Sequence, residues 1–184
     1  MLGIRHYQGA AIDLWQGDIT TFVCDGMATS TNSQLDGSGG VNGAIHSAAG
    51  VELVEACRTI GSCETGKAVF TPAGQLPARF VIHAVGPVWS GGNANESNHL
   101  ASAYQAIWQL AEEQQLRHVA VPSISTGNCK YPVAQAADVA MTSIKQYFTV
   151  KRRYPQRISF VLFDSEHYQH FQQALFQAFP ELNS

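Results

Sequence analysis

Short apolar runs rich in β-branched residues alternate along this chain with longer stretches whose apolar residues recur at helical spacing. This alternation is typical of helices that cover both faces of a parallel or mixed sheet. We therefore expect an α/β fold, a three-layer α/β/α sandwich with a central mixed, largely parallel sheet of about six strands. The predicted strands are 11–15, 26–30, 67–70, 80–85, 118–122 and 158–163. The predicted helices are 43–59, 97–113, 133–148 and 166–178.

Length and composition predict one folded domain. The chain has 184 residues, of which 45% are hydrophobic and 14% charged, so it can bury a core on both faces of a sheet and differs from disordered chains. The Gly/Asn-rich segment 90–98 is interpreted as a surface loop rather than a domain boundary. We therefore treat residues 1–184 as a single domain and expect a monomer.

Charge and hydropathy argue against two classes of partner. The formal net charge of −3 gives no general attraction to duplex nucleic acid, and the one basic run, Lys151-Arg152-Arg153, is short enough for a solvated loop. No stretch approaches the roughly 18 apolar residues of a membrane span, and no apolar signal region begins the sequence. We expect a cytoplasmic protein that binds neither duplex nucleic acid nor a membrane.

The four cysteines, Cys24, Cys57, Cys63 and Cys129, match neither a Cys-x-x-Cys redox pair nor a zinc module. An alternative is that Cys57 and Cys63 bind a metal together with His46, but scattered buried thiols are more common. We therefore expect reduced thiols, no metal and no cofactor.

Glycine is concentrated between the predicted strand 26–30 and the helix that follows it. A glycine-rich turn of this kind lets backbone N–H groups approach an anion, and the next helix adds the positive end of its dipole. A second loop, 123–128, also follows an apolar strand and precedes a helix. Two such loops at neighbouring strand ends favour a diphosphate held between them. The glycines of the first turn are Gly37, Gly39, Gly40 and Gly43.

Several motifs, in the same order along nearly the whole chain, resemble those of macrodomains. The resemblance is closest to the MacroD-type branch, whose members remove ADP-ribose from acidic side chains or deacetylate O-acetyl-ADP-ribose. The motifs are Gly17-Asp18-Ile19-Thr20, Asn32-Ser33, Gly37-Ser38-Gly39-Gly40-Val41, Gly43-Ala44-Ile45-His46, Val81-Ile82-His83-Ala84-Val85-Gly86-Pro87, Pro122-Ser123-Ile124-Ser125-Thr126-Gly127 and Phe163-Asp164.

The resemblance implies a role for each part of the ADP-ribose site. Asp18 would accept a hydrogen bond from the adenine amino group, the backbone of Ile19 would meet the ring edge, and Phe163 would stack on the ring. Asn32 would bond the distal ribose. His46 and His83 are interpreted as structural residues rather than general bases. The two phosphate loops would supply Gly37, Ser38, Gly39, Gly40, Val41, Ser125, Thr126, Gly127, Asn128 and Cys129.

The sequence departs from the family pattern at the distal-ribose end. Thr29 replaces the first asparagine of Asn-x-x-Asn, and Asn42 replaces the aspartate after the glycine loop that helps activate water in hydrolytic MacroD members. An amide holds water but takes no proton, so a factor of about 10²–10⁴ in rate is missing. Cys129 and Lys130 stand where the family has an aromatic residue and a glycine. Asp36 is an alternative source of a carboxylate.

These departures predict that binding survives better than catalysis. We expect a module that recognises free or protein-linked ADP-ribose, with weak ADP-ribosyl ester hydrolysis or O-acetyl-ADP-ribose deacetylation through Asn32 and Asn42. The alternatives are a fully active mono-ADP-ribosyl hydrolase and an ADP-ribose 1″-phosphate phosphatase. On this view an aspartate at position 42 raises the rate.

Overall fold

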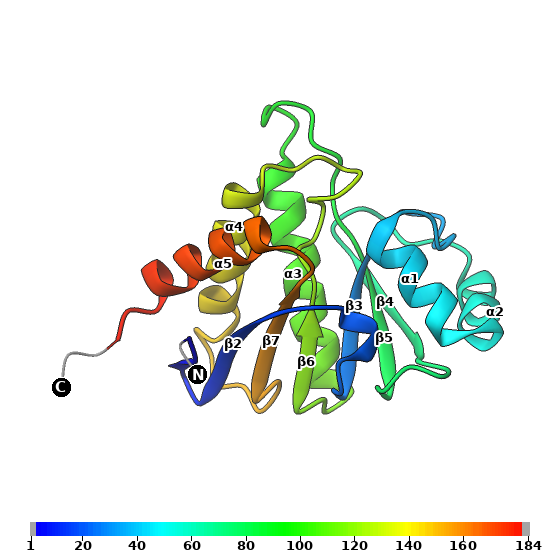
Figure 1. Ribbon diagram of the computed structural model, residues 1–184, viewed down its shortest axis with the longest axis horizontal. Helices are drawn as coiled ribbons and strands as arrows, with labels where there is room; N and C mark the ends of the chain where they lie inside the picture. The colour runs from blue at the N-terminus through cyan, green and yellow to red at the C-terminus, as the bar shows by residue number, and fades with distance from the viewer. Residues whose placement is uncertain (1–2, 182–184) are drawn as a thin grey trace.

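The computed structural model describes residues 3–181, whose centre is a seven-stranded sheet in the order β1-β2-β7-β6-β3-β5-β4 (Figure 1). The five inner strands run parallel, and β1 and β4 pair antiparallel at the two edges. The strands are β1 (Arg5–Tyr7), β2 (Ala10–Gln16), β3 (Gly26–Thr31), β4 (Ala68–Pro72), β5 (Phe80–Val85), β6 (His118–Val121) and β7 (Arg157–Leu162). The helices are η1 (Ile19–Thr21), α1 (Gly40–Ala49), α2 (Val51–Ile60), α3 (Glu96–Glu113), α4 (Val133–Tyr147) and α5 (Ser165–Ala178).

The predicted α/β sandwich is confirmed, with one strand more than expected. All six predicted strands are present, and β1 is the addition. It forms a hairpin with β2 through Gln8 and Gly9, whose φ angles of 49° and 87° are both positive. Positive φ at both central residues is the geometry of the tightest hairpin turns. The strand is only three residues long, too short to show an apolar alternation.

The single helix predicted for 43–59 is wrong, because two helices cover this segment. Gly50 separates α1 from α2 with φ of 90°, a backbone conformation that ends a helix and that glycine adopts without a Cβ penalty. The Gly50 N–H still donates to the His46 carbonyl, so the chain closes α1 before it turns into α2. A pattern of apolar spacing continues through such a break and does not reveal it.

The two faces of the sheet bury separate cores. Side chains alternate between the faces along each strand, so Ile158 and Phe160 of β7 point to one core and Val161 to the other. The larger core lies under α3, α4 and α5, and the smaller lies under α1 and α2. Figure 1 shows α1 and α2, in cyan, on the opposite side of the view from α4 and α5. Among the helices in residues 3–181, none is long and apolar enough to cross a membrane.

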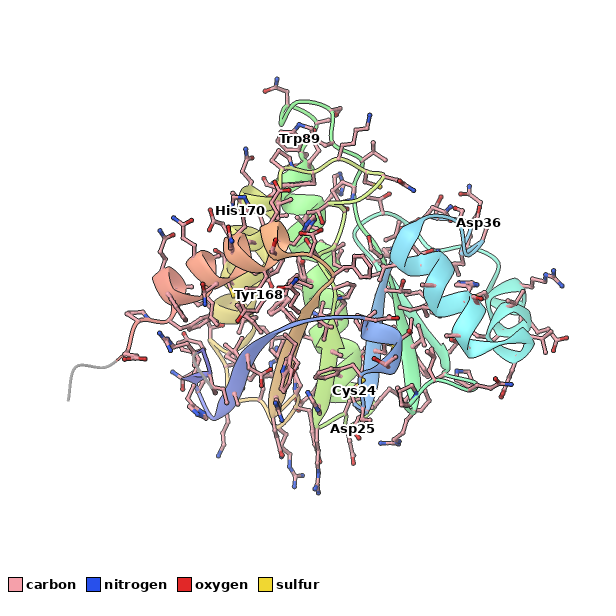
Figure 2. All side chains as sticks on the ribbon, in the orientation of Figure 1. Cys24, Asp25, Asp36, Trp89, Tyr168 and His170 are labelled. Atoms are coloured by element: carbon pink, nitrogen blue, oxygen red, sulfur yellow. The ribbon has the colours of Figure 1, made fainter. Side chains whose placement is uncertain are left out.

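The parallel arrangement brings five loops to the same end of the sheet. Because β2, β7, β6, β3 and β5 run in one direction, the segments that follow their carboxyl ends lie beside one another. Figure 2 shows Asp36 and Trp89, from two of these loops, at the upper end of the molecule, whereas Asp25 lies at the lower end. In open α/β sheets ligands bind at the carboxyl ends of the strands. The predicted site residues therefore fall where a site is expected.

Candidate functional site

The glycine loop between β3 and α1 is braced by its own side chains. Asp36 Oδ1 accepts from the Asn32 amide at 2.9 Å and from the Ser38 backbone N–H at 3.0 Å. The Asn32 amide also donates to the Ser38 hydroxyl at 3.1 Å. Gly37 and Gly39 have φ of 73° and 89°, values that side chains other than glycine rarely adopt. The loop therefore has a fixed shape and leads directly into the N-terminus of α1, where Gly39 is the N-cap.

Asn42 lies buried beneath this loop rather than at the surface. Its side chain is 2% exposed and makes three hydrogen bonds. Its Oδ1 accepts from the Thr29 hydroxyl at 3.2 Å, and its Nδ2 donates to the Thr31 hydroxyl at 3.2 Å and the Ser38 carbonyl at 3.1 Å. Two departures from the family pattern, Thr29 and Asn42, are thus bonded to each other. Asn42 ties β3 to the glycine loop.

The second loop approaches the first closely. A methyl group added at Gly39 would lie 3.0 Å from the Asn128 side-chain nitrogen. Ser125 has a positive φ of 65°, and its backbone N–H donates to the Ser30 hydroxyl at 3.1 Å. The buried Ser125 hydroxyl lies against Gly86, where any Cβ would overlap with it. The two loops predicted to hold a diphosphate are therefore brought together over the end of the sheet.

Asp18 and Phe163 lie together at one end of the row of loops, after the neighbouring strands β2 and β7. The Gly17 N–H donates to the Leu162 carbonyl at 2.9 Å, which places Asp18 beside the end of β7. Asp18 Oδ1 caps η1 by accepting from the Thr20 N–H at 2.9 Å, while in residues 3–181 no donor is bonded to Oδ2. The Phe163 ring is 81% exposed, so it is not a core residue. An exposed ring beside a carboxylate suits an aromatic ligand that carries an amino group.

A cavity of about 350 Å³ lies at the other end, near the glycine loop. This volume is at the lower end of the range for small-molecule sites. One wall is polar and includes Asn32, and the other follows the carboxyl end of β5. The lining residues are Thr31, Asn32, Ser33, Thr65, Val85, Gly86, Pro87, Val88, Ala94, Glu96 and Cys129.

The carboxylates and the thiol around this cavity are poor proton acceptors. Hydrogen bonds from Ser38, and then from Asn32, hold the pKa of Asp36 below its usual range. The Glu96 carboxylate accepts from the backbone N–H groups of Ser90, Gly92 and Ala94, which lowers its pKa to about 2. Burial raises the pKa of the Cys129 thiol, which therefore stays protonated at neutral pH. Within residues 3–181, no carboxylate near the cavity has the raised pKa that favours a general base.

His46, Cys57 and His83 meet in the core behind the glycine loop. Their ligand atoms lie within 4.8 Å of one another, whereas Cys63 is not part of the group. His83 Nε2 lies 2.9 Å from the Thr71 hydroxyl and 3.8 Å from the Cys57 sulfur. Burial lowers the pKa of both histidines, that of His83 to about 4. We interpret the group as neutral core packing that supports Gly37, against which the His46 ring lies.

The free energy of unfolding is expected to fall by about 2 kcal/mol between pH 7 and pH 5 on account of His83 alone. Its pKa is lower in the folded state than the ordinary value of 6.5, so the unfolded chain takes up the proton first as the pH falls. The contribution is complete above pH 6.5 and is lost as the pH falls towards 4. Urea unfolding of the parent protein and of His83→Gln across this range measures it. If the free energy of unfolding changed with pH equally in the two proteins, a buried neutral His83 would be contradicted.

Part of the cavity lining was not predicted from the sequence. Thr65, Val88 and Glu96 line the cavity but belong to no motif noted in the sequence, and Glu96 is 2% exposed although a Glu early in a helix suggests only a helix-dipole partner. Conversely, Ile19 is buried and offers only its backbone, and Lys130 is exposed beyond the second loop. The remaining predicted loop residues are exposed or half-buried in the two loops: Ser38, Gly40, Val41, Thr126 and Gly127.

Comparisons with known proteins agree with this architecture. The Macro domain family model matches residues 28–140. The O-acetyl-ADP-ribose deacetylase of Enterobacter cloacae subsp. cloacae is 45% identical, over 93% of this chain and 97% of its own. A macro domain-containing protein of Cupriavidus necator is 43% identical, over 91% of this chain and 98% of its own.

Solved structures agree as well. The Oceanobacillus iheyensis macrodomain with ADP has a TM-score of 0.86 and 33% identity, and the match covers 94% of each chain. The Trypanosoma brucei macrodomain in complex with ADP-ribose has a TM-score of 0.81 and 30% identity, over 89% of this chain and 68% of that one. This chain therefore belongs to the macrodomain family.

Proposed function

We propose that this chain, as a single macrodomain, binds ADP-ribose across the carboxyl ends of the parallel strands and slowly hydrolyses esters of its distal ribose. Relatives 45% identical are named O-acetyl-ADP-ribose deacetylase, and a neighbour in structure is a complex with ADP-ribose. O-acetyl-ADP-ribose is therefore the substrate that we propose.

The observation that carries the proposal is the order of three features along the carboxyl ends of the strands, which follows the sheet order β2-β7-β6-β3-β5. An exposed ring and a carboxylate, Phe163 and Asp18, come first. The two loops that meet at Gly39 and Asn128 follow. The cavity lined by Asn32 comes last. An aromatic base, a diphosphate and a terminal sugar occur in this order in ADP-ribose.

Each end of the ligand has a chemical match. The free oxygen of the Asp18 carboxylate suits the exocyclic amine of adenine, and Phe163 offers a face for stacking. The positive end of the α1 dipole and the backbone N–H groups of Gly39, Gly40 and Asn128 suit the phosphates. Asn32, whose amide can both donate and accept, suits the hydroxyls of the distal ribose.

For hydrolysis, a water attacks the acyl carbon, the bond from that carbon to the ribose oxygen breaks, and the ribose oxygen takes a proton. The products are a carboxylic acid and ADP-ribose. Asp36 and Glu96 hold low pKa values, and the Asn42 amide is bonded beneath the loop. The groups left to position the water are Asn32 and the diphosphate of the substrate. Without a tuned base, a rate below that of a general-base enzyme by about 10²–10⁴ is expected.

The test is incubation with O-acetyl-ADP-ribose in ¹⁸O-water, followed by mass spectrometry of both products. We expect slow release of acetate that carries the label, together with unlabelled ADP-ribose. Phe163→Ala should raise KM about tenfold and leave kcat nearly unchanged, because stacking on adenine contributes equally before and during the reaction. If the protein binds ADP-ribose but releases no acetate above the uncatalysed rate, hydrolysis is refuted and only binding remains.

A further inference from the structure

The cavity at the distal end has two chemically different walls. Thr31, Asn32 and Ser33, at the end of β3, form a hydroxyl- and amide-bearing wall that suits a sugar. The other wall is formed by the end of β5 and the segment after it, and it offers hydrocarbon from Val85, Gly86, Pro87, Val88 and Ala94. None of the side chains on this second wall carries a hydrogen-bonding group. That wall therefore suits an apolar group attached to the sugar.

The apolar wall is held in place before any ligand arrives. Glu96 accepts hydrogen bonds from the backbone of Ser90, Gly92 and Ala94 and so fixes the turn of the loop. The Trp89 N–H donates to the Cys129 carbonyl at 2.8 Å, and the Trp89 ring packs on Tyr131 with centroids 4.8 Å apart. Figure 2 shows Trp89 at the upper end of the molecule, where this loop meets the second phosphate loop. Because this wall is already fixed, it loses little conformational entropy when a ligand binds.

Val88 leaves apolar surface uncovered at this wall. Its side chain is 68% exposed although it lines the cavity. Contact between this surface and a ligand hydrocarbon would remove both from water. The charge around the cavity is consistent with a neutral group, because its lining residues include the Glu96 carboxylate and no Lys or Arg.

We propose that this apolar wall is an acyl subsite, which selects O-acyl-ADP-ribose with an aliphatic chain longer than acetyl over esters that carry a second carboxylate. The proposal rests on the proposed function, since it names the substrate class of the same groove. Each methylene placed against the wall should raise kcat/KM about fourfold, so the butyryl ester should exceed the acetyl ester about 15-fold. The succinyl ester, of similar length but charged, should fall below the acetyl ester.

The experiment measures kcat/KM for the acetyl, propionyl, butyryl and succinyl esters of ADP-ribose, and the affinity of ADP-ribose itself. Val88→Ser should reduce the butyryl-to-acetyl ratio from about 15 to about 4 or less. Val23→Ser is the matched control, because Val23 is 76% exposed and adjoins Cys24, which Figure 2 places at the lower end of the molecule. The Val23→Ser variant should keep the butyryl-to-acetyl ratio of kcat/KM at about 15.

The outcomes separate the two proposals. If ADP-ribose binds and the acetyl ester is hydrolysed, but the rate is independent of chain length or unaffected by Val88→Ser, the acyl subsite is refuted and the proposed function stands. If ADP-ribose binds and no ester is hydrolysed, the esters are titrated instead, and equal dissociation constants for the acetyl and butyryl forms refute the subsite. If neither ADP-ribose nor any ester binds, both proposals fall.

Discussion

An Asn42→Asp variant is expected to be about 3 kcal/mol less stable than the parent protein, because it puts a carboxylate into a site built for an amide. Asn42 is 2% exposed, and its Nδ2 donates to the Ser38 carbonyl at 3.1 Å. A carboxylate oxygen cannot donate and would face that carbonyl oxygen directly. Urea unfolding measures the loss, and calorimetry should show weaker ADP-ribose binding because the glycine loop loses its anchor.

Two further variants sharpen this prediction. Asn93→Asp makes the same exchange at an exposed loop position whose side chain makes no hydrogen bond within residues 3–181, and should not lower stability. Thr29→Asn combined with Asn42→Asp should recover part of the loss, since Thr29 is hydrogen-bonded to residue 42 and an amide there supplies a stronger donor. An Asn42→Asp variant that is fully stable and hydrolyses the ester faster would instead support the general-base role expected from the sequence.

A Gly37→Ala variant is expected to bind ADP-ribose about 100-fold more weakly, a loss of about 2.7 kcal/mol. The added Cβ would lie 2.6 Å from Nδ1 of His46, whose ring is held in α1, so the loop must move. The φ of 73° adds roughly 1 kcal/mol of strain for any residue with a Cβ. Isothermal titration with ADP-ribose measures the loss.

Gly9→Ala, in the β1–β2 hairpin, is the control for backbone strain alone. Its φ of 87° is also positive, but nothing lies within 4 Å of the added Cβ. This variant should be slightly less stable and bind ADP-ribose as the parent protein does. If Gly37→Ala also binds normally, the close packing of the glycine loop on His46 does not shape the phosphate site.

The sequence predicted six of the seven strands and the position of the glycine loop because both depend on local patterns. Short apolar runs rich in β-branched residues located β2–β7, and the position of glycine after β3 located the loop. The break at Gly50 was missed because helical spacing continues across it. The burial of Asn42 was missed for a different reason. The identity of a residue does not reveal which neighbours will form hydrogen bonds with its side chain. Its partners Thr29 and Thr31 come from an adjacent strand, and only the fold brings them together.

The cavity lined by Asn32 could not be predicted from the sequence either, because its walls come from distant parts of the chain. Its polar wall follows β3 and its apolar wall follows β5, which are neighbours in the sheet but about 50 residues apart in sequence. Glu96 carries no motif that distinguishes it from any acidic residue at the start of a helix. Its role depends on the backbone N–H groups that the preceding loop directs at it.

The central claim is that one groove binds the whole of ADP-ribose, with the diphosphate between the two loops. Isothermal titration of the protein with ADP-ribose and with adenosine, in the same buffer, tests it most directly. We predict a dissociation constant in the micromolar range for ADP-ribose, about −8 kcal/mol, and binding at least about 100-fold weaker for adenosine, which lacks the phosphates and the distal ribose. Equal affinities for the two ligands, or no binding of ADP-ribose at millimolar concentration, would contradict the account.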